Sequence, residues 1–511
     1  MSFALVHSRA LLGMRAPKVT VEVHLANGLP SFSLVGLAET EVKEARERVR
    51  CAIQHSGLEF PTNKRITVNL APADLPKDSG RFDLPIALGI LAAHGQIDAT
   101  ALQQYTFAGE LSLSGSLRPV RGALPMGLAL HQAAECTRLV LPPESAEEAA
   151  LVPGTEVYRA RHLRDVVVRF ALPGQCQPEP ETHDGWVRLQ PPPLPQSPAC
   201  ALDLSDVTGQ AGPRRALEIA GAGGHSLLLV GPPGTGKSML AHRLIGLLPD
   251  MSLEEALESA AISSVSGHFN LQQWRRRPMR SPHHTATPAA LAGGGNPPRP
   301  GEISLAHHGV LFLDELPELP RHALEALREP LETGMITLSR AAVQAEFPAR
   351  FQLVAAMNPC PCGHLGSRLK ACRCTPDQVA RYQGKLSGPL LDRIDLQAEV
   401  ATLPPEELTH AAHHETTAQV RARCLAAHAR ALDRQGCANH SLTGAPLLQH
   451  AQLAPSAERL LQQTARQLGW SGRGLHRTMR VARTIADLAA SATVQVHHMA
   501  EAVQYRRVLA P

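Results

Sequence analysis

The chain has 511 residues, which is too long for a single hydrophobic core and predicts about three domains. Its hydrophobic content of 44% and charged content of 19% are those of a globular protein and exclude a disordered chain. The net charge of +4 does not by itself indicate a nucleic-acid partner, and an aromatic content of 3% argues against extensive base stacking. Any contact with nucleic acid is therefore expected to be mainly with phosphates.

The amino-terminal residues and the cysteines indicate a compartment. The first nine residues lack a charged segment followed by a long apolar core, so we expect no export signal. The most apolar stretch, residues 84–93, is too short to span a bilayer, so no membrane partner is expected. Ten cysteines in a chain of this length do not suggest a disulfide scaffold. These observations predict a cytoplasmic protein.

Composition divides the chain into regions. Residues 173–200 contain eight prolines and little periodic apolar pattern, which predicts an extended Pro-rich linker. This linker follows an amino-terminal domain at 1–172. A second boundary is expected near Pro404 and Pro405. Residues 401–511 have helical periodicity and are expected to form an all-helical lid, which leaves 201–400 as the central domain.

Residues 231–238 form a complete phosphate-binding loop. They are Gly231, Pro232, Pro233, Gly234, Thr235, Gly236, Lys237 and Ser238. An apolar strand precedes the loop and an apparent helix follows it, which is the context that this motif requires. Backbone N–H groups and the helix N-terminus would hold phosphate oxygens, Lys237 would reach the β- and γ-phosphates, and Ser238 would hold Mg²⁺. We therefore expect the chain to bind ATP with Mg²⁺.

Two further strands of the central region end in polar residues. The apolar run 310–313 is followed by Asp314 and Glu315. Such a run is typical of a buried parallel strand, after which Asp314 would complete the Mg²⁺ shell and Glu315 would polarise the attacking water. The run 351–357 delivers Asn358, whose amide would hydrogen-bond the water or the γ-phosphate as a sensor. These residues predict hydrolysis as well as binding.

Four of the ten cysteines lie within 15 residues. Cys360 and Cys362 form one Cys-x-Cys pair, and Cys372 and Cys374 form a second pair after nine intervening residues. Four thiolates can close a tetrahedral structural Zn²⁺ site, although this spacing is tighter than the usual Cys-x2-Cys. Free thiols on a loop and redox-sensitive pairs are the alternatives. A metal-bound loop just after Asn358 would rigidify the chain where it leaves the strand that carries this sensor residue.

Two arginines are candidates for phosphate contacts from outside the loop. Arg393 lies at an expected domain edge, where an arginine of an oligomeric ATPase reaches the γ-phosphate of the neighbouring subunit. A surface salt bridge with Asp392 or Asp395 is the alternative. Arg473, at the start of an expected lid helix, is the candidate for a second sensor, and Arg477 is its alternative.

These motifs occur in the order of the AAA+ ATPases. The segments SPHHT at 281–285, RPGEISLAH at 299–307 and MNPCPCG at 357–363 resemble the magnesium-chelatase-like branch of that class. Within the branch, the chain resembles the ComM/YifB family over nearly its whole length. The resemblance implies an α/β AAA+ core with a helical lid. It further implies an ATP-promoted homo-hexameric ring that translocates on single-stranded and branched DNA as a helicase and drives branch migration during natural transformation.

The resemblance also indicates where DNA would be held. Residues 335–347 alternate in polarity around a small-residue tip, which predicts a β-hairpin. In related ring helicases such a hairpin points into the pore with a basic tip, so Arg340 is assigned to a DNA phosphate, with a solvated arginine as the alternative. By resemblance, a second pore loop includes a run of arginines that would line a phosphate track or form a solvated edge: Arg275, Arg276 and Arg277. Two histidine pairs nearby are interpreted as structural or phosphate-adjacent, not as metal ligands: His283–His284 and His307–His308.

The amino-terminal domain resembles the Lon-protease type, which is an α/β fold. Lon proteases use a Ser–Lys dyad. Arg81 occupies the position that matches the nucleophilic serine, and the lysine position falls near Pro125. A displaced dyad of Ser79 and Lys77 is the alternative. We expect this domain to have no peptidase activity and to act as a collar that either forms the ring or guides DNA.

Two other functions are open from the sequence. A protein-remodelling unfoldase would combine the same motor with a Lon-like domain, but its threading loops usually offer an aromatic residue where this chain has Arg340. A metal-chelatase motor subunit fits residues 205–400, although such subunits are not expected to carry the amino-terminal domain. The intact Glu315 disfavours a nucleotide-gated scaffold without turnover.

Overall fold

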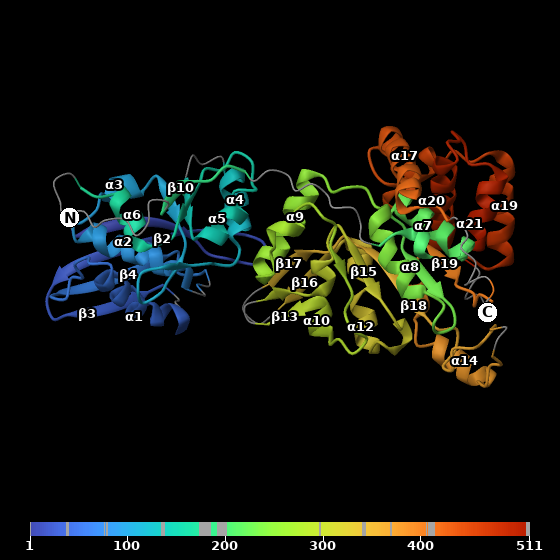
Figure 1. The fold of residues 1–511 in the computed structure, drawn as a ribbon, viewed down its shortest axis with the longest axis horizontal. Helices are drawn as coiled ribbons and strands as arrows, with labels where there is room; N and C mark the ends of the chain where they lie inside the picture. Colours follow the sequence, from blue (N-terminus) through green and yellow to red (C-terminus); the bar gives the residue numbers. More distant parts are fainter. Residues whose placement is uncertain are drawn as a thin grey trace.

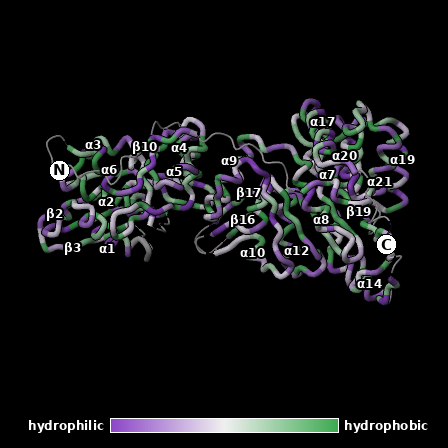
Figure 2. Tube along the Cα trace, in the orientation of Figure 1, coloured by the Kyte–Doolittle hydropathy of each residue, from purple (hydrophilic) through white to green (hydrophobic). Residues whose placement is uncertain are grey.

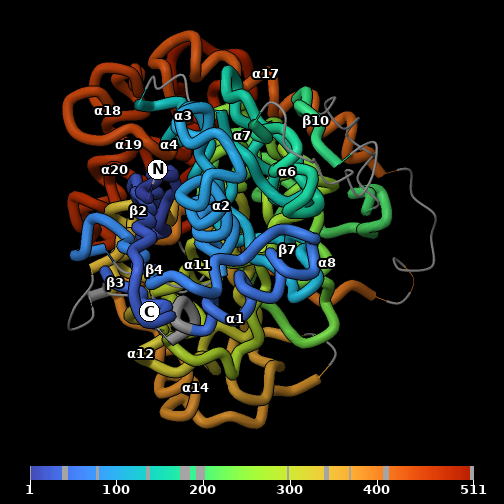
Figure 3. Tube along the Cα trace, turned by 90° about the vertical axis from the view of Figure 1, so that its left-hand side faces the viewer, coloured from blue at the N-terminus to red at the C-terminus, as the bar shows by residue number. Residues whose placement is uncertain are grey.

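The computed structural model describes residues 2–36, 40–75, 77, 80–133, 138–172, 185–191, 202–295, 298–339, 344–367, 370–404, 406 and 414–506. An amino-terminal unit lies at one end of the elongated molecule, a central motor domain follows it, and helices of the lid lie at the other end (Figure 1). Seen along the long axis, the lid helices and α14 lie on opposite sides of the molecule (Figure 3). Among the described helices, none is long and apolar enough to cross a membrane.

An eight-stranded mixed sheet forms the amino-terminal unit, in the order β10-β9-β8-β5-β1-β2-β4-β3. Its strands are β1 (Phe3–Arg9), β2 (Lys18–Asn27), β3 (Ser31–Val35), β4 (Lys64–Ala71), β5 (Tyr105–Phe107), β8 (Arg138–Leu141), β9 (Val157–Ala160) and β10 (Trp186–Arg188). A short hairpin, β6 (Glu110–Leu111) with β7 (Leu117–Arg118), lies outside the sheet. The helices are α1 (Thr40–His55), α2 (Asp83–Ala93), α3 (Ala99–Leu102), α4 (Ala123–Gln132), α5 (Pro143–Ala149) and α6 (Leu163–Arg169).

The helix α2 is the centre of this unit because all of its residues are buried. After its first residue, Asp83, the helix is apolar throughout and lacks the one-sided pattern of a surface helix, as expected when a helix is covered on every side. Hydrophobic segments run through both this unit and the motor in Figure 2. The unit therefore has its own core.

The strand β10 lies inside 173–200, where the sequence analysis expected only a linker. It pairs antiparallel with β9, and the Trp186 ring stacks on Tyr158 with ring centroids 5.2 Å apart. Trp186 also meets Phe170 edge-on. This aromatic packing outweighs the proline-rich surroundings, so the amino-terminal domain extends beyond 172.

The motor is built on a parallel five-stranded sheet in the order β12-β15-β18-β11-β19. The strands are β11 (Leu227–Val230), β12 (Met279–Arg280), β15 (Val310–Leu313), β18 (Gln352–Met357) and β19 (Leu396–Glu399). Two small hairpins accompany it: β13 (Gly293–Gly294) with β14 (Arg299–Pro300), and β16 (Met335–Ser339) with β17 (Gln344–Pro348). The helices are α7 (Ala211–Gly223), α8 (Lys237–Arg243), α9 (Leu253–Ser266), α10 (Pro288–Ala292), α11 (Glu302–Leu305), α12 (Arg321–Ala326), α13 (Pro330–Thr333), α14 (Pro376–Gln383) and α15 (Gly388–Leu391).

The lid consists of five described helices packed on the motor: α17 (Thr417–Gln435), α18 (Gly444–Ala451), α19 (Pro455–Gln467), α20 (Gly472–Leu488) and α21 (Val496–Gln504). A buried polar contact fastens it to the sheet, since the His225 ring lies 3.2 Å from Asp395 and 2.7 Å from Thr484 of α20. The predicted helical lid and parallel α/β core are thus confirmed.

The helix α9 joins the amino-terminal unit to the motor. Leu124 and Val152 of the amino-terminal unit pack with Ala260 and Trp274 of the motor in one buried cluster. The backbone N–H of Gly122 donates to the carbonyl of Ser264 at 3.3 Å. The same end of α9 packs against the strands of the β16–β17 hairpin, where it meets Ala345 and Phe347. The amino-terminal unit, α9 and the hairpin strands therefore form one packed assembly.

Candidate functional site

The phosphate-binding loop follows β11 and leads into α8. Gly236 has φ of +90°, in the left-handed region that favours glycine, and this turn sets the first residues of α8. The buried Nζ of Lys237 donates to the carbonyls of Gly231 at 2.7 Å and Pro232 at 2.8 Å. Burial lowers the pKa of Lys237, and the nearby Asp314 and Glu315 oppose that effect. The loop thus presents its cation beside two carboxylates.

Two oxygen donors meet between the loop and the neighbouring strand end. The hydroxyl of Ser238 donates to Oδ2 of Asp314 at 2.6 Å, although the residues are 76 positions apart. The other carboxylate oxygen accepts the backbone N–H of Glu315 at 2.9 Å. Hydroxyl and carboxylate oxygens are ligands that Mg²⁺ prefers, and Mg²⁺ is held by few protein groups together with substrate phosphates. The residues present therefore fit the expected magnesium site.

The candidate catalytic acid, Glu315, is held in an unusual backbone conformation. Its φ of +51° is left-handed, which is uncommon for a residue other than glycine and marks strain that surrounding structure must support. Its carboxylate lies 3.0 Å from Nδ1 of His284, which follows β12. Sequence reasoning missed this contact. The available signal was the place of His284 four residues after β12, a strand that pairs with β15.

The predicted sensor lies at the same edge of the sheet. Asn358 follows β18, the strand between β15 and β11, and its Oδ1 accepts a hydrogen bond from Lys237 at 3.1 Å. Because carboxyl ends of parallel strands share one edge, the three loops converge there. The structure brings together five predicted residues: Lys237, Ser238, Asp314, Glu315 and Asn358.

The two predicted arginines lie elsewhere, at the amino edge of the sheet. The backbone carbonyl of Arg393 accepts from the hydroxyl of Ser226 at 3.4 Å. Ser226 directly precedes β11, whereas the phosphate loop follows it, so a four-residue strand of about 13 Å separates them. Neither Arg393 nor Arg473 has a described contact with the phosphate loop of its own chain.

Instead, both arginines bind one carboxylate. Arg393 donates to Oε2 of Glu332, and Arg473 donates to Oε1 of the same residue at 3.2 Å. Arg393 and then Arg473 lower the pKa of Glu332. They line a cavity of about 220 Å³ together with Arg477 and Arg480. We call this space the arginine cavity.

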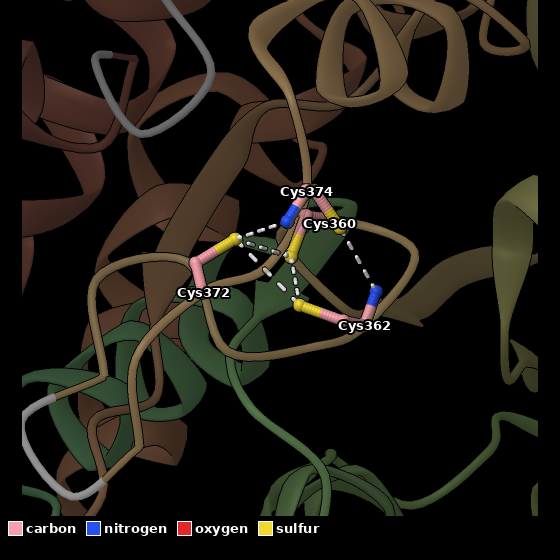
Figure 4. Close-up of side chains that lie close together, drawn as sticks. All are labelled: Cys360, Cys362, Cys372 and Cys374. Atoms are coloured by element: carbon pink, nitrogen blue, oxygen red, sulfur yellow. Dashed lines mark hydrogen bonds between the residues drawn. The ribbon is translucent and has the colours of Figure 1, made fainter.

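The four clustered cysteines converge as predicted, with their sulfur atoms directed toward one another (Figure 4). The Sγ of Cys360 lies 3.4 Å from that of Cys362 and 3.7 Å from that of Cys372, and the sulfurs of Cys362 and Cys372 are 3.6 Å apart. All four lie within 4.8 Å of one another. Tetrahedral zinc with Zn–S distances of about 2.3 Å requires sulfur separations of about 3.8 Å. The residues therefore fit a Zn²⁺ site, which we call the cysteine clip.

The cysteine clip touches the ATP site. Gly363, between the two cysteine pairs, has φ of +80°, and a Cβ placed on it would lie 2.6 Å from Cδ of Pro233 in the phosphate loop. Backbone N–H groups of Arg373 and His364 lower the pKa of Cys362 to about 6. The side-chain amide of Gln383, in α14, donates to the carbonyl of Pro359 at 3.0 Å. The clip is thus packed between the phosphate loop and α14.

The structure describes some of the candidate DNA-contacting residues and not others. The hairpin over 335–347 is present as β16 and β17, but its tip with Arg340 lies outside the described residues. Arg277 does not fit a solvent-facing phosphate track. It donates to the carbonyls of Pro249 at 2.6 Å and His308 at 2.7 Å, which pulls its guanidinium inward.

Arg275 and Arg276, which precede Arg277, are held differently. Arg275 has φ of +62° and is half-buried beside the carbonyl of Met251, at 3.5 Å, whereas Arg276 is exposed. Of these three described arginines, Arg276 is therefore the one whose side chain is exposed.

The histidines of the second pair form a hydrogen-bonded network. The Nε2 atoms of His307 and His308 lie 3.0 Å and 2.8 Å from the same oxygen of Glu258. The backbone N–H of Arg350 donates to Nδ1 of His307, so the proton of the neutral ring is on Nε2 and points at Glu258. A metal ion at Nε2 of His307 would compete with this proton. The geometry therefore favours a structural role for the two histidines over a role as metal ligands.

The protease-like dyad has little support in the described residues. Arg81 is 1% exposed, so it presents no reactive group to solvent. The Nζ of Lys77 is buried and donates to the carbonyl of Pro72, while burial lowers its pKa. Ser79 lies outside the described residues.

Family models for a magnesium-chelatase subunit match most of the chain. "Magnesium chelatase, subunit ChlI" matches residues 203–408, "Subunit ChlI of Mg-chelatase" matches 21–145, and "Magnesium chelatase, subunit ChlI C-terminal" matches 414–506. The matched ranges correspond to the motor, most of the amino-terminal unit and the lid.

Individual relatives are similar over the whole length. The YifB protein of Salmonella typhimurium is 49% identical over 99% of this chain and 98% of its own length. The competence protein ComM of Haemophilus influenzae is 48% identical over 100% of this chain and 98% of its own length. The chloroplastic magnesium-chelatase subunit ChlI of Oryza sativa subsp. indica is 23% identical over 58% of this chain and 69% of its own length.

Proposed function

This chain belongs to the ComM/YifB family of magnesium-chelatase-like AAA+ ATPases, and from that membership we propose that it is an ATP-driven DNA translocase. It assembles as a ring, a homo-hexamer, moves on single-stranded and branched DNA, and promotes branch migration of recombination intermediates during natural transformation. The observation that carries the DNA part of this proposal is the 48% identity, across the full length, with a relative named as a competence protein.

ATP hydrolysis is assigned to the carboxyl edge of the motor sheet. Lys237 neutralises charge on the β- and γ-phosphates, and Ser238 and Asp314, which are hydrogen-bonded to each other, are the residues that would hold Mg²⁺. When bound there, Mg²⁺ would neutralise negative charge on the phosphate oxygens. Glu315 orients and polarises the attacking water, and His284 fixes its carboxylate at 3.0 Å. Asn358 senses the γ-phosphate from its position beside Lys237.

A second copy of the chain completes each site. Arg393 and Arg473 lie at the amino edge of their own sheet and bind Glu332, far from their own phosphate loop. In a ring, the same arginines face outward to the nucleotide of a neighbour and stabilise charge in its transition state. This placement supports hydrolysis that requires assembly.

DNA is assigned to the assembly of the hairpin, α9 and the amino-terminal unit. Phe347 of the hairpin and Val265 of α9 are buried together against Leu11 and Met14 of the amino-terminal unit, so the strands of the hairpin are firmly supported. A supported hairpin can transmit force to a phosphate bound by Arg340 at its tip. Arg276 adds an exposed cation near the same helix. The Lon-protease-like fold assigned to the amino-terminal unit would serve here as a collar without peptidase activity.

The cysteine clip is assigned to a structural Zn²⁺ held by Cys360, Cys362, Cys372 and Cys374. Zinc would supply a cross-link between the exit of β18 and the segment that leads to α14. The packing of Gly363 on Pro233 makes this cross-link a support for the phosphate loop.

A strand-exchange assay tests the proposed function. Purified protein with ATP should extend branch migration on a three-stranded DNA intermediate, and Glu315→Gln should bind the same DNA without extending the branch. Absence of ATP-dependent branch movement by the unaltered protein, combined with ATP-dependent unfolding of a protein substrate, would instead indicate an unfoldase.

A further inference from the structure

The carboxylate of Glu332 occupies a position that no step of hydrolysis explains. It lies on α13 and is half-exposed, yet each of its oxygens binds a different arginine. Arg393 is nearly buried, with 8% of its side chain exposed, whereas 64% of the Arg473 side chain is exposed. A single carboxylate thus joins the motor to the first turn of lid helix α20.

The surroundings of Glu332 have an excess of positive charge. Four arginines line the arginine cavity, and Glu332 and Asp392 are the carboxylates among its lining residues. Asp392 is also close to Arg506, with 3.5 Å between them. Glu332 is therefore the principal counter-ion of Arg393 and Arg473 among the described residues. A triphosphate carries more negative charge than one carboxylate and can accept bidentate hydrogen bonds from the same guanidinium groups.

We propose that Glu332 is a built-in counter-ion that holds Arg393 and Arg473 in an idle position and is displaced when the triphosphate of the neighbouring copy enters the arginine cavity. This inference rests on the proposed function, because it assigns the two arginines to the neighbour's nucleotide. Glu332 is a positioning residue, since it acts through the arginines and does not touch the substrate.

The same residue is connected to the hairpin. Glu332 is followed by Thr333 and Gly334, and β16 begins at Met335. The carbonyl of Gly334 accepts the backbone N–H of Ala349 at 2.7 Å, just after β17 ends. The connection between α13 and the hairpin is therefore short and closed by a hydrogen bond. A displacement of the hairpin by DNA would move Glu332 relative to Arg393, so the counter-ion also transmits the presence of DNA to hydrolysis.

Glu332→Gln in the full chain tests this inference, with Glu329→Gln as the matched control. Glu329 is exposed and three residues away on the same turn. Without the competing charge, the variant should raise the DNA-free turnover number by about 1.5-fold to fivefold, the range expected for exposed ion pairs. DNA should then stimulate it less than it stimulates the unaltered protein. The control should match the unaltered protein in both quantities.

The outcomes separate the inference from the function on which it rests. A Glu332→Gln variant with unchanged basal and DNA-stimulated turnover, or with lower basal turnover at an unchanged melting temperature, would overturn the counter-ion role. Glu332→Ala provides a second variant if the Glu332→Gln protein folds poorly. Unimpaired turnover in Arg393→Ala would overturn the proposed arginine function itself. Lack of DNA stimulation in the unaltered protein would overturn the translocase function, while the basal rates would still decide the role of Glu332.

Discussion

The Nδ1 atom of His284 lies 3.0 Å from the carboxylate of Glu315, across the gap between the end of β12 and the end of β15. Glu315 has a left-handed backbone, so its side chain depends on this contact and on the surrounding fold for its direction. The position of the candidate catalytic acid is thus set by a residue in the segment that follows the adjacent strand.

Removal of this contact should slow hydrolysis without preventing binding. We expect His284→Ala to lower kcat about tenfold, because the acid is no longer oriented, and Glu315→Gln to lower it by about 100-fold or more. Steady-state ATPase assays and binding of a fluorescent ATP analogue measure both effects. His322→Ala is the control, since His322 is an exposed histidine of α12, whereas His283 packs on the ring of His284 with centroids 4.0 Å apart. Equal loss in both histidine variants would contradict a specific role for His284.

Subunit mixing should reveal that the arginine site acts between copies. Arg393→Ala and Lys237→Ala should each lower turnover by about 10³-fold, the first by loss of charge stabilisation and the second by loss of nucleotide binding. A mixture should regain activity, because Lys237→Ala subunits supply Arg393 to intact phosphate loops of Arg393→Ala subunits. Mixed samples that stay as inactive as the separate variants, while still assembling by light scattering, would contradict a shared site.

The cysteine clip should contain zinc and support nucleotide binding. We expect about one zinc per chain by mass spectrometry, lost in Cys360→Ser and retained in the control Cys437→Ser. Gly363→Ala should keep the metal but weaken ATP binding, because an L-residue at this positive φ costs about 1–2 kcal/mol and its Cβ would press on Pro233. Retained zinc in Cys360→Ser, or unchanged ATP affinity in Gly363→Ala, would contradict these assignments.

The interface between the amino-terminal unit and the motor should weaken as pH rises. Glu148 accepts a hydrogen bond from the backbone N–H of Leu124 at 3.3 Å and lies beside Ser264 of α9. Burial raises its pKa from 4.5 to about 7, so the folded state holds a proton that the unfolded state releases. The contribution of Glu148 to the free energy of unfolding is therefore greatest below pH 4.5, falls by about 3 kcal/mol as the pH rises from 4.5 to 7, and then levels off.

Replacement of this carboxyl should remove the pH dependence. Glu148→Gln keeps the acceptor for Leu124 and cannot ionise, so its melting temperature at pH 8 should exceed that of the unaltered protein, with little difference at pH 4.5. The control is the exposed Glu147→Gln on the same helix. A melting temperature at pH 8 that is equal in all three proteins would show that Glu148 does not ionise at the interface.

Arg340 should couple DNA to turnover without supporting hydrolysis itself. Arg340→Ala is expected to keep the basal ATPase rate and to lose most DNA stimulation, because a phosphate contact at the hairpin tip is removed. Arg466→Ala, an exposed lid arginine, is the matched control. Stimulation that is unchanged in Arg340→Ala would remove the hairpin tip from the proposed DNA path.

Local sequence patterns predicted the ATP site because each of its parts lies directly after an apolar strand. Lys237, Asp314 and Asn358 follow β11, β15 and β18, and a parallel sheet brings such ends together without further information. The cysteine clip was also predictable, since its four ligands lie within 15 residues. The general fold and the family followed from the same motifs.

Contacts between distant segments could not be predicted in this way. Glu332 is 61 residues from Arg393 and 141 from Arg473, and no spacing rule connects them. The guanidinium of Arg277 is turned inward by two carbonyl groups from other loops, so neither the phosphate track nor the solvated edge that the arginine run left open describes this residue. Likewise, strand β10 follows from the packing of Trp186 on Tyr158, which proline density conceals.

The most direct test of the central claim is the ATPase rate of the purified full chain without DNA, with single-stranded DNA and with forked DNA, at several salt concentrations. An ATP-driven DNA translocase predicts stimulation by both DNA forms that falls as salt rises, because the contacts are mainly with phosphates. A rate that no DNA changes at any salt concentration, but that an unfolded protein raises, would contradict the account and indicate a protein-remodelling motor.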